Sequence, residues 1–240
     1  QHYFSKWKLK HVNENRFINS FEEYVDQDLN WFFDPWLHTT RKLDYAISNF
    51  KTMKTEKGSW DVELGINNLG NRFLPMKIKT YFPDGTSNDR WWDRHLWRFQ
   101  DTLKYTTNKQ PVKVVMDPDV QTLDMDLRNN STKMKKTILF DWPGIWYNPR
   151  DEMVYWWSPN FYYNSDNSDF APGLNIKKRY GPYESTTFRA NYALNSKAIY
   201  WYLGGWRQSV HHLPRTKFYF WAFNRPGVKE YGAEIEKKWN

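Results

Sequence analysis

Apolar and polar residues alternate along much of this chain, and no other feature of the sequence restricts its fold as strongly. The alternation recurs in three segments between Leu43 and Asn130, whose apolar positions are Val62, Leu64 and Ile66; Met76, Ile78 and Phe82; and Leu123, Met125 and Leu127. Successive side chains of a strand point to opposite faces, so this period of two predicts strands with one buried and one wet face. Turn signals at residues 68–71, 83–85 and 117–119 separate them. Residues 41–134 are therefore predicted to form an Ig-like antiparallel β-sandwich.

Residues 1–40 follow a different, helical period. The positions that recur at helical spacing are Phe17, Phe21, Tyr24 and Val25. Asn13 is the expected N-cap of this helix, and Asp28 is expected to cap a second, short helix that carries four aromatic residues in residues 31–36. Pro35 lacks a backbone N–H and is expected to end or kink the short helix. Residues 3–9 are also expected to belong to a helix that needs a partner.

Several of these segments resemble the zinc aminopeptidases typified by aminopeptidase N. The segment DLNWFFDPWL at residues 28–37 is similar to the aromatic signature that closes the metal-bearing domain of that family, and residues 3–8 with 11–13 are similar to the preceding helical turn and loop. Residues 38–45 fit the entry to the family's small sandwich. The segments NNLGNRFLPMKIKTYFPDGT and VVMDPDVQTLDMDLRNN are similar to its central hairpin and its end. Two departures are Pro35, where a polar residue is usual, and the missing Gly-x-Pro before Leu43.

The resemblance covers residues 1–130 and implies a fragment. Residues 1–40 would be the terminal helices of an upstream catalytic domain, and residues 41–134 would be a non-catalytic sandwich that braces it. A start at Gln1 rather than Met agrees with an upstream portion. The alternative is that the aromatic cluster is ordinary core packing in an unrelated helical domain.

Residues 135–240 form the third predicted region, which follows a polar, basic linker at residues 131–136. Pro and Gly pairs divide it into units of about ten residues, and alternating runs such as 186–195 and 231–236 are rich in aromatic residues. This pattern predicts an aromatic-rich antiparallel β-region of about five strands, and it is typical of an outer-membrane β-barrel. The segment WSPNFYYN at residues 157–164 resembles an opening strand of the bacterial surface-antigen type of barrel. A partial barrel and a soluble second β-domain packed on the sandwich both stay open.

Composition adds three limits. The mean hydropathy is −0.91 and there is no run of eighteen apolar residues that would predict a membrane-spanning helix. Without cysteine, the chain offers neither disulfides nor a thiolate metal site. The net charge of +8 with 20% aromatic residues could suit single-stranded nucleic acid. We expect no nucleic acid, however, because the basic residues are scattered and no RNA-binding motif occurs.

The residues that catalyse aminopeptidase chemistry are missing from this sequence. That chemistry needs His-Glu-x-x-His, a further Glu and a Tyr, yet no His is followed by Glu and no two His stand four positions apart. We therefore predict no catalytic, cofactor-binding or metal-binding residue in this chain. The resemblance implies zinc only for the upstream domain.

Four constellations remain as weaker candidates. Trp91, Trp92 and Trp97 around residues 93–95 could form a carbohydrate platform, although packing at the sandwich rim is the favoured interpretation. Asp117 and Asp119 could bind calcium, but a turn capped by these side chains is favoured. The pair Asp151-Glu152 is not expected to act on one glycosidic bond. The pair His211-His212 is expected to lie in a solvated loop.

The leading functional hypothesis is a non-catalytic C-terminal part of a zinc-dependent aminopeptidase-like metallopeptidase. The parent would hydrolyse N-terminal peptide bonds with a zinc-activated water, and it could equally have lost its metal site. The expected partners are the upstream domain, the parent's peptide substrates and the outer membrane, with a location in the bacterial cell envelope. The alternative is an envelope module that binds glycans or another protein without enzymatic activity.

Overall fold

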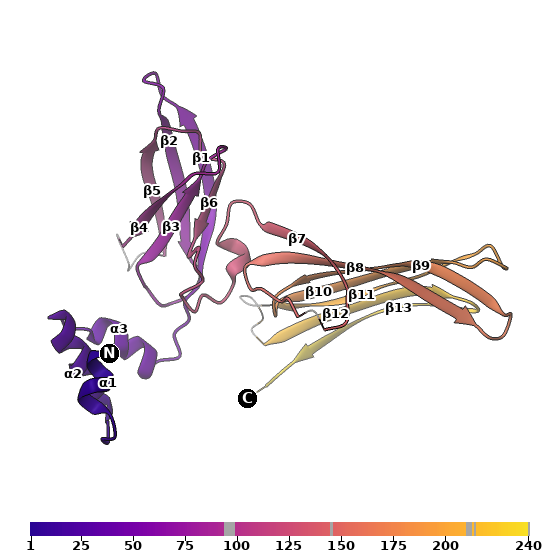
Figure 1. Ribbon diagram of the computed structural model, residues 1–240, viewed down its shortest axis with the longest axis horizontal. Coiled ribbons are helices and arrows are strands. Elements are labelled where there is room, and N and C mark those ends of the chain that lie inside the picture. The colour runs from indigo at the N-terminus through magenta and orange to yellow at the C-terminus, as the bar shows by residue number, and fades with distance from the viewer. Residues whose placement is uncertain (94–98, 145, 210–212, 214, 240) are drawn as a thin grey trace.

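The computed structural model describes residues 1–93, 99–144, 146–209, 213 and 215–239. Over this part of the chain the fold is mainly β, with short N-terminal helices, two three-stranded sheets and one seven-stranded sheet (Figure 1). The expectation of a mainly β chain with an N-terminal helical segment is confirmed. No helix in the described residues is long and apolar enough to cross a lipid bilayer.

The three N-terminal helices are α1 (His2–Trp7), α2 (Glu14–Val25) and α3 (Asn30–Leu37). Asn13 caps α2 as expected, because its Oδ1 accepts the Arg16 N–H at 3.0 Å. The helices pack through aromatic rings whose centroids lie 5.0–5.8 Å apart, those of Tyr3, Phe17, Phe21 and Phe33. Of the four aromatic residues predicted to cluster in residues 31–36, Phe33 belongs to the core of this small helical layer.

Helix α3 differs from expectation at Pro35. The Asp28 carboxylate accepts the Asn30 N–H at 2.8 Å, but the N-cap residue of the helix is Leu29 and not Asp28. The helix also continues two residues beyond Pro35 to Leu37. The Pro35 carbonyl accepts hydrogen bonds from Thr39 Oγ1 at 2.7 Å and from the Arg72 guanidinium. The same guanidinium lies 3.7 Å from the centre of the Trp36 ring. Contacts from outside the helix therefore hold the turn that the proline alone would weaken.

Two three-stranded antiparallel sheets follow the helices, and we call them together the two-sheet unit. One sheet has the order β1 (Tyr45–Lys54), β2 (Trp60–Asn68), β5 (Gln100–Thr107), and the other has the order β4 (Ser87–Trp92), β3 (Met76–Tyr81), β6 (Lys113–Met116). Both sheets contribute to one core, composed of Leu43, Tyr45, Leu64, Ile66, Leu74, Met76, Ile78, Trp92, Val114 and Met116. The alternation predicted for residues 62–66 and 76–82 is thus confirmed, since its apolar members are buried.

The third predicted strand of this region, residues 123–127, is wrong. The segment is a loop that leads into a 3₁₀ helix, η1 (Leu127–Asn129), and Leu123 is 62% exposed. The acidic residues that alternate with the apolar ones explain why no strand forms. Asp124 accepts the N–H groups of Tyr45 and Asp126, both at 2.9 Å, and Asp126 accepts that of Arg128 at 3.1 Å. Side-chain acceptors of this kind compete with a strand ladder for backbone donors.

The seven-stranded sheet has its strands in chain order, and these are β7 (Lys135–Phe140), β8 (Glu152–Asn164), β9 (Asp169–Tyr180), β10 (Glu184–Tyr192), β11 (Ile199–Ser209), β12 (Thr216–Arg225) and β13 (Val228–Lys237). All neighbours are antiparallel except β7, which runs parallel to β8. The described residues thus hold two more strands here than the five expected. The sheet extends away from one end of the two-sheet unit, while the helices lie near the same end on the other side of the view (Figure 1).

Candidate functional site

One face of the seven-stranded sheet is apolar and open to solvent. The strand register places Trp157, Ile176, Phe188, Leu203, Ala222 and Tyr231 in one row across six strands. Every second residue from this row lies on the same face. Of the sixteen exposed large apolar side chains in the described strands β7–β13, only Val228 lies on the opposite face. The other fifteen are Ile138, Phe140, Trp157, Phe161, Tyr163, Phe170, Leu174, Phe188, Tyr192, Ile199, Trp201, Leu203, Phe220, Tyr231 and Ile235. We call this surface the apolar face.

The opposite face carries most of the charge, and we call it the polar face. Its charged residues are Lys135, Glu152, Asp169, Lys177, Arg179, Arg189, Lys217, Arg225, Glu230, Glu234 and Glu236. Hydrogen bonds cross the strands here, including Asn160 Nδ2 to Asn191 Oδ1 at 2.8 Å and Tyr219 OH to Glu236 at 2.8 Å. A hollow of about 220 Å³ in this region is lined by residues that include Asn160, Arg189, Asn191, Tyr200, Tyr202 and Arg225. The sheet therefore separates an apolar side from a hydrogen-bonded, charged side.

The apolar face has a definite length along the strands. On β8 its exposed residues run from Trp157 to Tyr163, which is seven residues or roughly 20 Å at about 3.3 Å per residue. The apolar band of strands that cross an outer membrane is about 25 Å tall, and such strands need 9–11 residues when tilted. By contrast, the largest apolar patch of a typical soluble monomer covers only a few hundred Å². The exposed run on β8 thus covers seven of the nine to eleven residues of such a strand.

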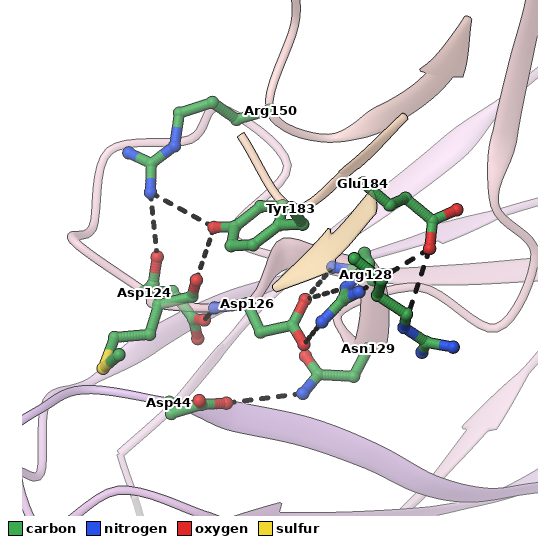
Figure 2. A network of polar contacts seen from close by, with 10 residues as sticks. Asp44, Asp124, Asp126, Arg128, Asn129, Arg150, Tyr183 and Glu184 are labelled. Atoms are coloured by element: carbon green, nitrogen blue, oxygen red, sulfur yellow. Dashed lines mark hydrogen bonds and ion pairs between the residues drawn. The ribbon is translucent and has the colours of Figure 1, made fainter. Parts of the chain in front are cut away.

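A polar joint fixes the sheet to the two-sheet unit (Figure 2). Buried Tyr183, between β9 and β10, donates its hydroxyl to the Met125 carbonyl. Arg150 donates to the Asp124 carbonyl at 3.3 Å and to the Tyr183 hydroxyl at 3.4 Å. A small apolar cluster surrounds these bonds and consists of Met153, Tyr180 and Tyr183 with Met125, Met134 and Tyr155. We call this end of the sheet the proximal end.

Arg128 of η1 is the central cation of the joint. Its guanidinium donates two hydrogen bonds to the Asp126 carboxylate, at 2.7 and 2.6 Å, and lies 3.9 Å from Glu184. It also lies 5.0 Å from the centre of the Tyr183 ring. Glu184 on β10 is shared, because Lys178 lies 2.9 Å away and Arg207 lies 3.7 Å away. One guanidinium thus connects a loop of the two-sheet unit to the sheet.

Two buried acids beside the joint have raised pKa values. Burial, followed by the charge of neighbouring Asp124, raises the pKa of Asp44 to about 7. Burial likewise raises the pKa of Asp124. Asn129 Nδ2 donates to Asp44 at 3.3 Å, and the Asp124 carboxylate accepts the Tyr45 N–H. These carboxyl groups accept hydrogen bonds from backbone and side-chain groups at the joint. They therefore belong to a network that stabilises the structure.

The proposed tryptophan platform does not form from Trp91 and Trp92. These neighbours on β4 point to opposite faces: Trp91 is 65% exposed, whereas Trp92 is 2% exposed and belongs to the core. Trp92 Nε1 donates to Asp101 at 2.8 Å, and its ring packs edge-on against Tyr45. Residues 94–98, which include Trp97, lie outside the described residues. Trp92 thus packs, as favoured, rather than forming a platform, but it lies in the core and not at the rim.

The acids around Pro118 form the expected capped turn. Asp117 accepts the N–H groups of Gln121 and Thr122, both at 2.9 Å, and Asp119 accepts Lys77 Nζ at 2.8 Å. In the sections of chain that the structure describes, no three His, Asp or Glu side chains gather as a metal site would need. Asp151 is exposed, while Glu152 is buried and accepts Lys135 Nζ at 3.0 Å. The His211-His212 pair lies outside the described residues.

Sequence reasoning missed both main features of this site. The alternation in residues 186–195 and 231–236 contained the signal for the apolar face, whereas residues 201–203 and 218–221 are apolar or aromatic at every position and do not distinguish two faces. The structure places Trp201 and Leu203 on the exposed apolar face and Tyr202 on the polar face. The joint had no local signal, because it joins residues 44 and 124–129 to residues 150 and 183–184. Comparison with protein-family models, with curated proteins and with solved structures gave no match.

Proposed function

We propose that this chain is a non-catalytic, membrane-anchored scaffold in the cell envelope. The observation that carries the proposal is the single apolar face of the seven-stranded sheet, which gathers fifteen exposed large apolar side chains opposite a charged face. Lipid hydrocarbon would cover the apolar face, while the polar face would stay in water. Backbone groups at a sheet edge are costly in hydrocarbon, so the edge strands β7 and β13 would pair with further strands in the membrane.

Vesicle binding tests this proposal. The full chain is mixed with phosphatidylcholine vesicles that contain brominated acyl chains, which quench nearby tryptophans. We expect quenching of Trp157 and Trp201, which lie on the apolar face. Phe188→Glu puts a charge in the centre of that face and should weaken partitioning tenfold or more, since charged residues at the lipid face cost roughly 1–3 kcal/mol. The matched control is Thr187→Glu, whose side chain lies on the polar face across from Lys177. Equal effects of the two substitutions would contradict the proposal.

We further propose that the scaffold serves an aminopeptidase N-like zinc metallopeptidase, with residues 41–134 as an Ig-like sandwich. The sheet orders β1-β2-β5 and β4-β3-β6 match the A-B-E and C′-C-F orders of such sandwiches. The aromatic helix α3 packs on the core of the two-sheet unit through Phe32 and Trp36. Beside it lies an apolar groove of about 580 Å³, lined by residues that include Phe17, Trp31, Leu74, Trp91 and Leu123. An upstream domain would dock in this groove.

Two measurements test the enzyme proposal. The coding sequence upstream of Gln1 should contain His-Glu-x-x-His and a third-ligand Glu, and the complete gene product should hydrolyse an aminoacyl anilide in a chelator-sensitive way. An upstream domain without these ligands would contradict the enzyme proposal and leave the scaffold proposal standing.

The rival function is an envelope glycan-binding module, and one observation favours it. The hollow on the polar face combines Arg189 with the aromatic rings of Tyr200 and Tyr202. Aromatic rings beside hydrogen-bonding groups suit sugar rings. Soluble envelope glycans would then quench tryptophan fluorescence without vesicles, an effect that the scaffold does not produce.

A further inference from the structure

The charges on the apolar face are concentrated at one end. Its charged residues are Lys136, Lys178, Glu184, Arg207, Lys229 and Lys237, and only Lys229 lies away from the proximal end. The segments that adjoin the proximal strand ends add further charges. Counted over the described residues, the basic members of this rim are Lys133, Lys136, Arg150, Lys178, Arg207, Arg215, Lys237 and Lys238, and the acidic members are Asp151 and Glu184. We call these residues the proximal rim.

The opposite end of the apolar face is nearly neutral. Besides Lys229, the described segments that adjoin it carry Asp166 and Lys197, so two basic residues stand against one acidic residue. The proximal rim has eight basic residues against two acidic ones, a surplus of six. The two ends of the apolar face therefore differ in net charge: the proximal end is strongly basic and the opposite end is close to neutral.

Aromatic side chains accompany the basic ones at the proximal rim. Trp146 is 93% exposed and Trp239 is 80% exposed, and Lys237 Nζ lies 4.5 Å from the centre of the Trp239 ring. Lys136, Lys237 and Lys238 are exposed. Tryptophan and lysine together are the residues that settle at the boundary between lipid hydrocarbon and headgroups, because each has an apolar body and a polar end.

We infer that the proximal rim binds the phosphate groups of an anionic lipid layer, which places the two-sheet unit beside that layer. The inference rests on the proposed membrane function and deepens it, because it names the lipid chemistry and the orientation of the sheet. Each lysine or arginine near an anionic surface contributes attraction that falls off within a Debye length. The acidic pair Asp151 and Glu184 offsets only two of the eight basic charges, so the surplus of six remains.

The test uses the full chain and two kinds of vesicle, phosphatidylcholine alone and phosphatidylcholine mixed with phosphatidylglycerol. We expect tighter binding to the anionic vesicles, with a preference that falls as salt is raised. The triple substitution Lys136→Gln, Lys237→Gln and Lys238→Gln should weaken anionic binding roughly 100-fold while leaving binding to neutral vesicles unchanged. The matched control, Lys197→Gln with Lys229→Gln at the other end, should leave the preference intact.

The outcomes separate the two proposals. Equal binding to both vesicle types, or a triple variant that keeps the full preference, overturns the lipid-phosphate inference and leaves the anchored scaffold standing. Failure to bind either kind of vesicle overturns the anchoring proposal and the inference with it. If inorganic phosphate binds as tightly as the anionic vesicles, the rim is a phosphate site and its assignment to a lipid surface is wrong. The substituted side chains are exposed, so circular dichroism should show an unchanged fold.

Discussion

At the scale of single residues, a few buried polar groups specify how the parts of this molecule meet. Arg128 and Asp126 form a two-bonded ion pair that is 14% and 7% exposed, and Tyr183 hydrogen-bonds across the joint. Buried polar groups that keep partners cost little, whereas removal of one partner leaves the other unpaired. A single substitution at such a position should therefore destabilise the fold more than the few atoms that it removes would suggest.

Tyr45 gives the sharpest test of this point in the two-sheet unit. The ring is fully buried, and its hydroxyl accepts the Leu74 N–H at 3.1 Å and lies 3.3 Å from the Leu74 carbonyl. Tyr45→Phe should lower the free energy of unfolding by about 1–3 kcal/mol, because the Leu74 N–H loses its partner. Urea denaturation measures this loss. Tyr231→Phe, at a residue that is 88% exposed, is the control and should change stability by less than about 0.5 kcal/mol.

Asp44 makes stability depend on pH. Burial raises its pKa to about 7 in the folded chain, whereas an unfolded aspartate titrates near 3.9. The folded state therefore binds the proton more tightly between these values. The stability from this group is fully present below about pH 4 and is lost as pH rises through about 7, by at most about 4 kcal/mol. Asp44→Asn should flatten this part of the pH profile of unfolding. Asp166→Asn, in an exposed turn, should leave the profile as it is, and a similar change in both variants would contradict the assignment.

At the scale of elements, close backbone contact sets the pairing of β9 with β10. A Cβ on Gly173 would lie 2.0 Å from the Ala190 carbonyl oxygen, so this strand position accepts only glycine without movement of the backbone. Elements without such a constraint, such as the turn at Gly58, have open space around them. The pairing of the sheet thus depends on a position that carries no side chain.

Gly173→Ala should disrupt the β9–β10 ladder and destabilise the sheet by about 2 kcal/mol or more. Gly58→Ala is the control: its Cβ meets nothing within 4 Å, but the backbone has a φ of +83°, so it should cost about 1 kcal/mol from strain alone. Amide hydrogen exchange distinguishes the effects of these two substitutions. Faster exchange in β9 and β10 is expected only for Gly173→Ala, and protection that stays unchanged in these strands would count against the close contact.

At the scale of the whole molecule, the two-sheet unit has a core of its own, and smaller apolar contacts connect it to α3 and to the seven-stranded sheet. The core of the two-sheet unit is drawn from residues 43–116, and the contacts of the joint are few beside it. The apolar face of the seven-stranded sheet belongs to neither core. The apolar face can therefore contact an environment outside the molecule, while the core of the two-sheet unit stabilises that unit.

A truncated chain of residues 1–134 should fold cooperatively. It retains the complete core of the two-sheet unit and the bridge between Val115 and Ser131. It loses the contacts of the joint, which include those of Arg128 with Glu184 and of the Asp124 carbonyl with Arg150. Thermal melting followed by circular dichroism should show one β-rich transition at a somewhat lower temperature than in the full chain. A truncated chain that is unfolded or insoluble would mean that the boundary at residue 134 is misplaced.

The sequence by itself determined the local features of this protein. Period-two alternation, the Asn13 cap and the aromatic spacing of residues 17–36 are set by neighbours along the chain, so they predicted the helices, the buried strands β2 and β3 and the mainly β class. Tertiary structure decided where long-range contacts outweigh local preference. Arg72 and Thr39 hold α3 beyond Pro35, Tyr45 and Asp124 draw residues 123–127 out of a strand, and strand register gathers the apolar side chains of seven strands on one face. Register and packing join residues far apart in the chain, and a pattern read along the chain carries no record of which strands will become neighbours.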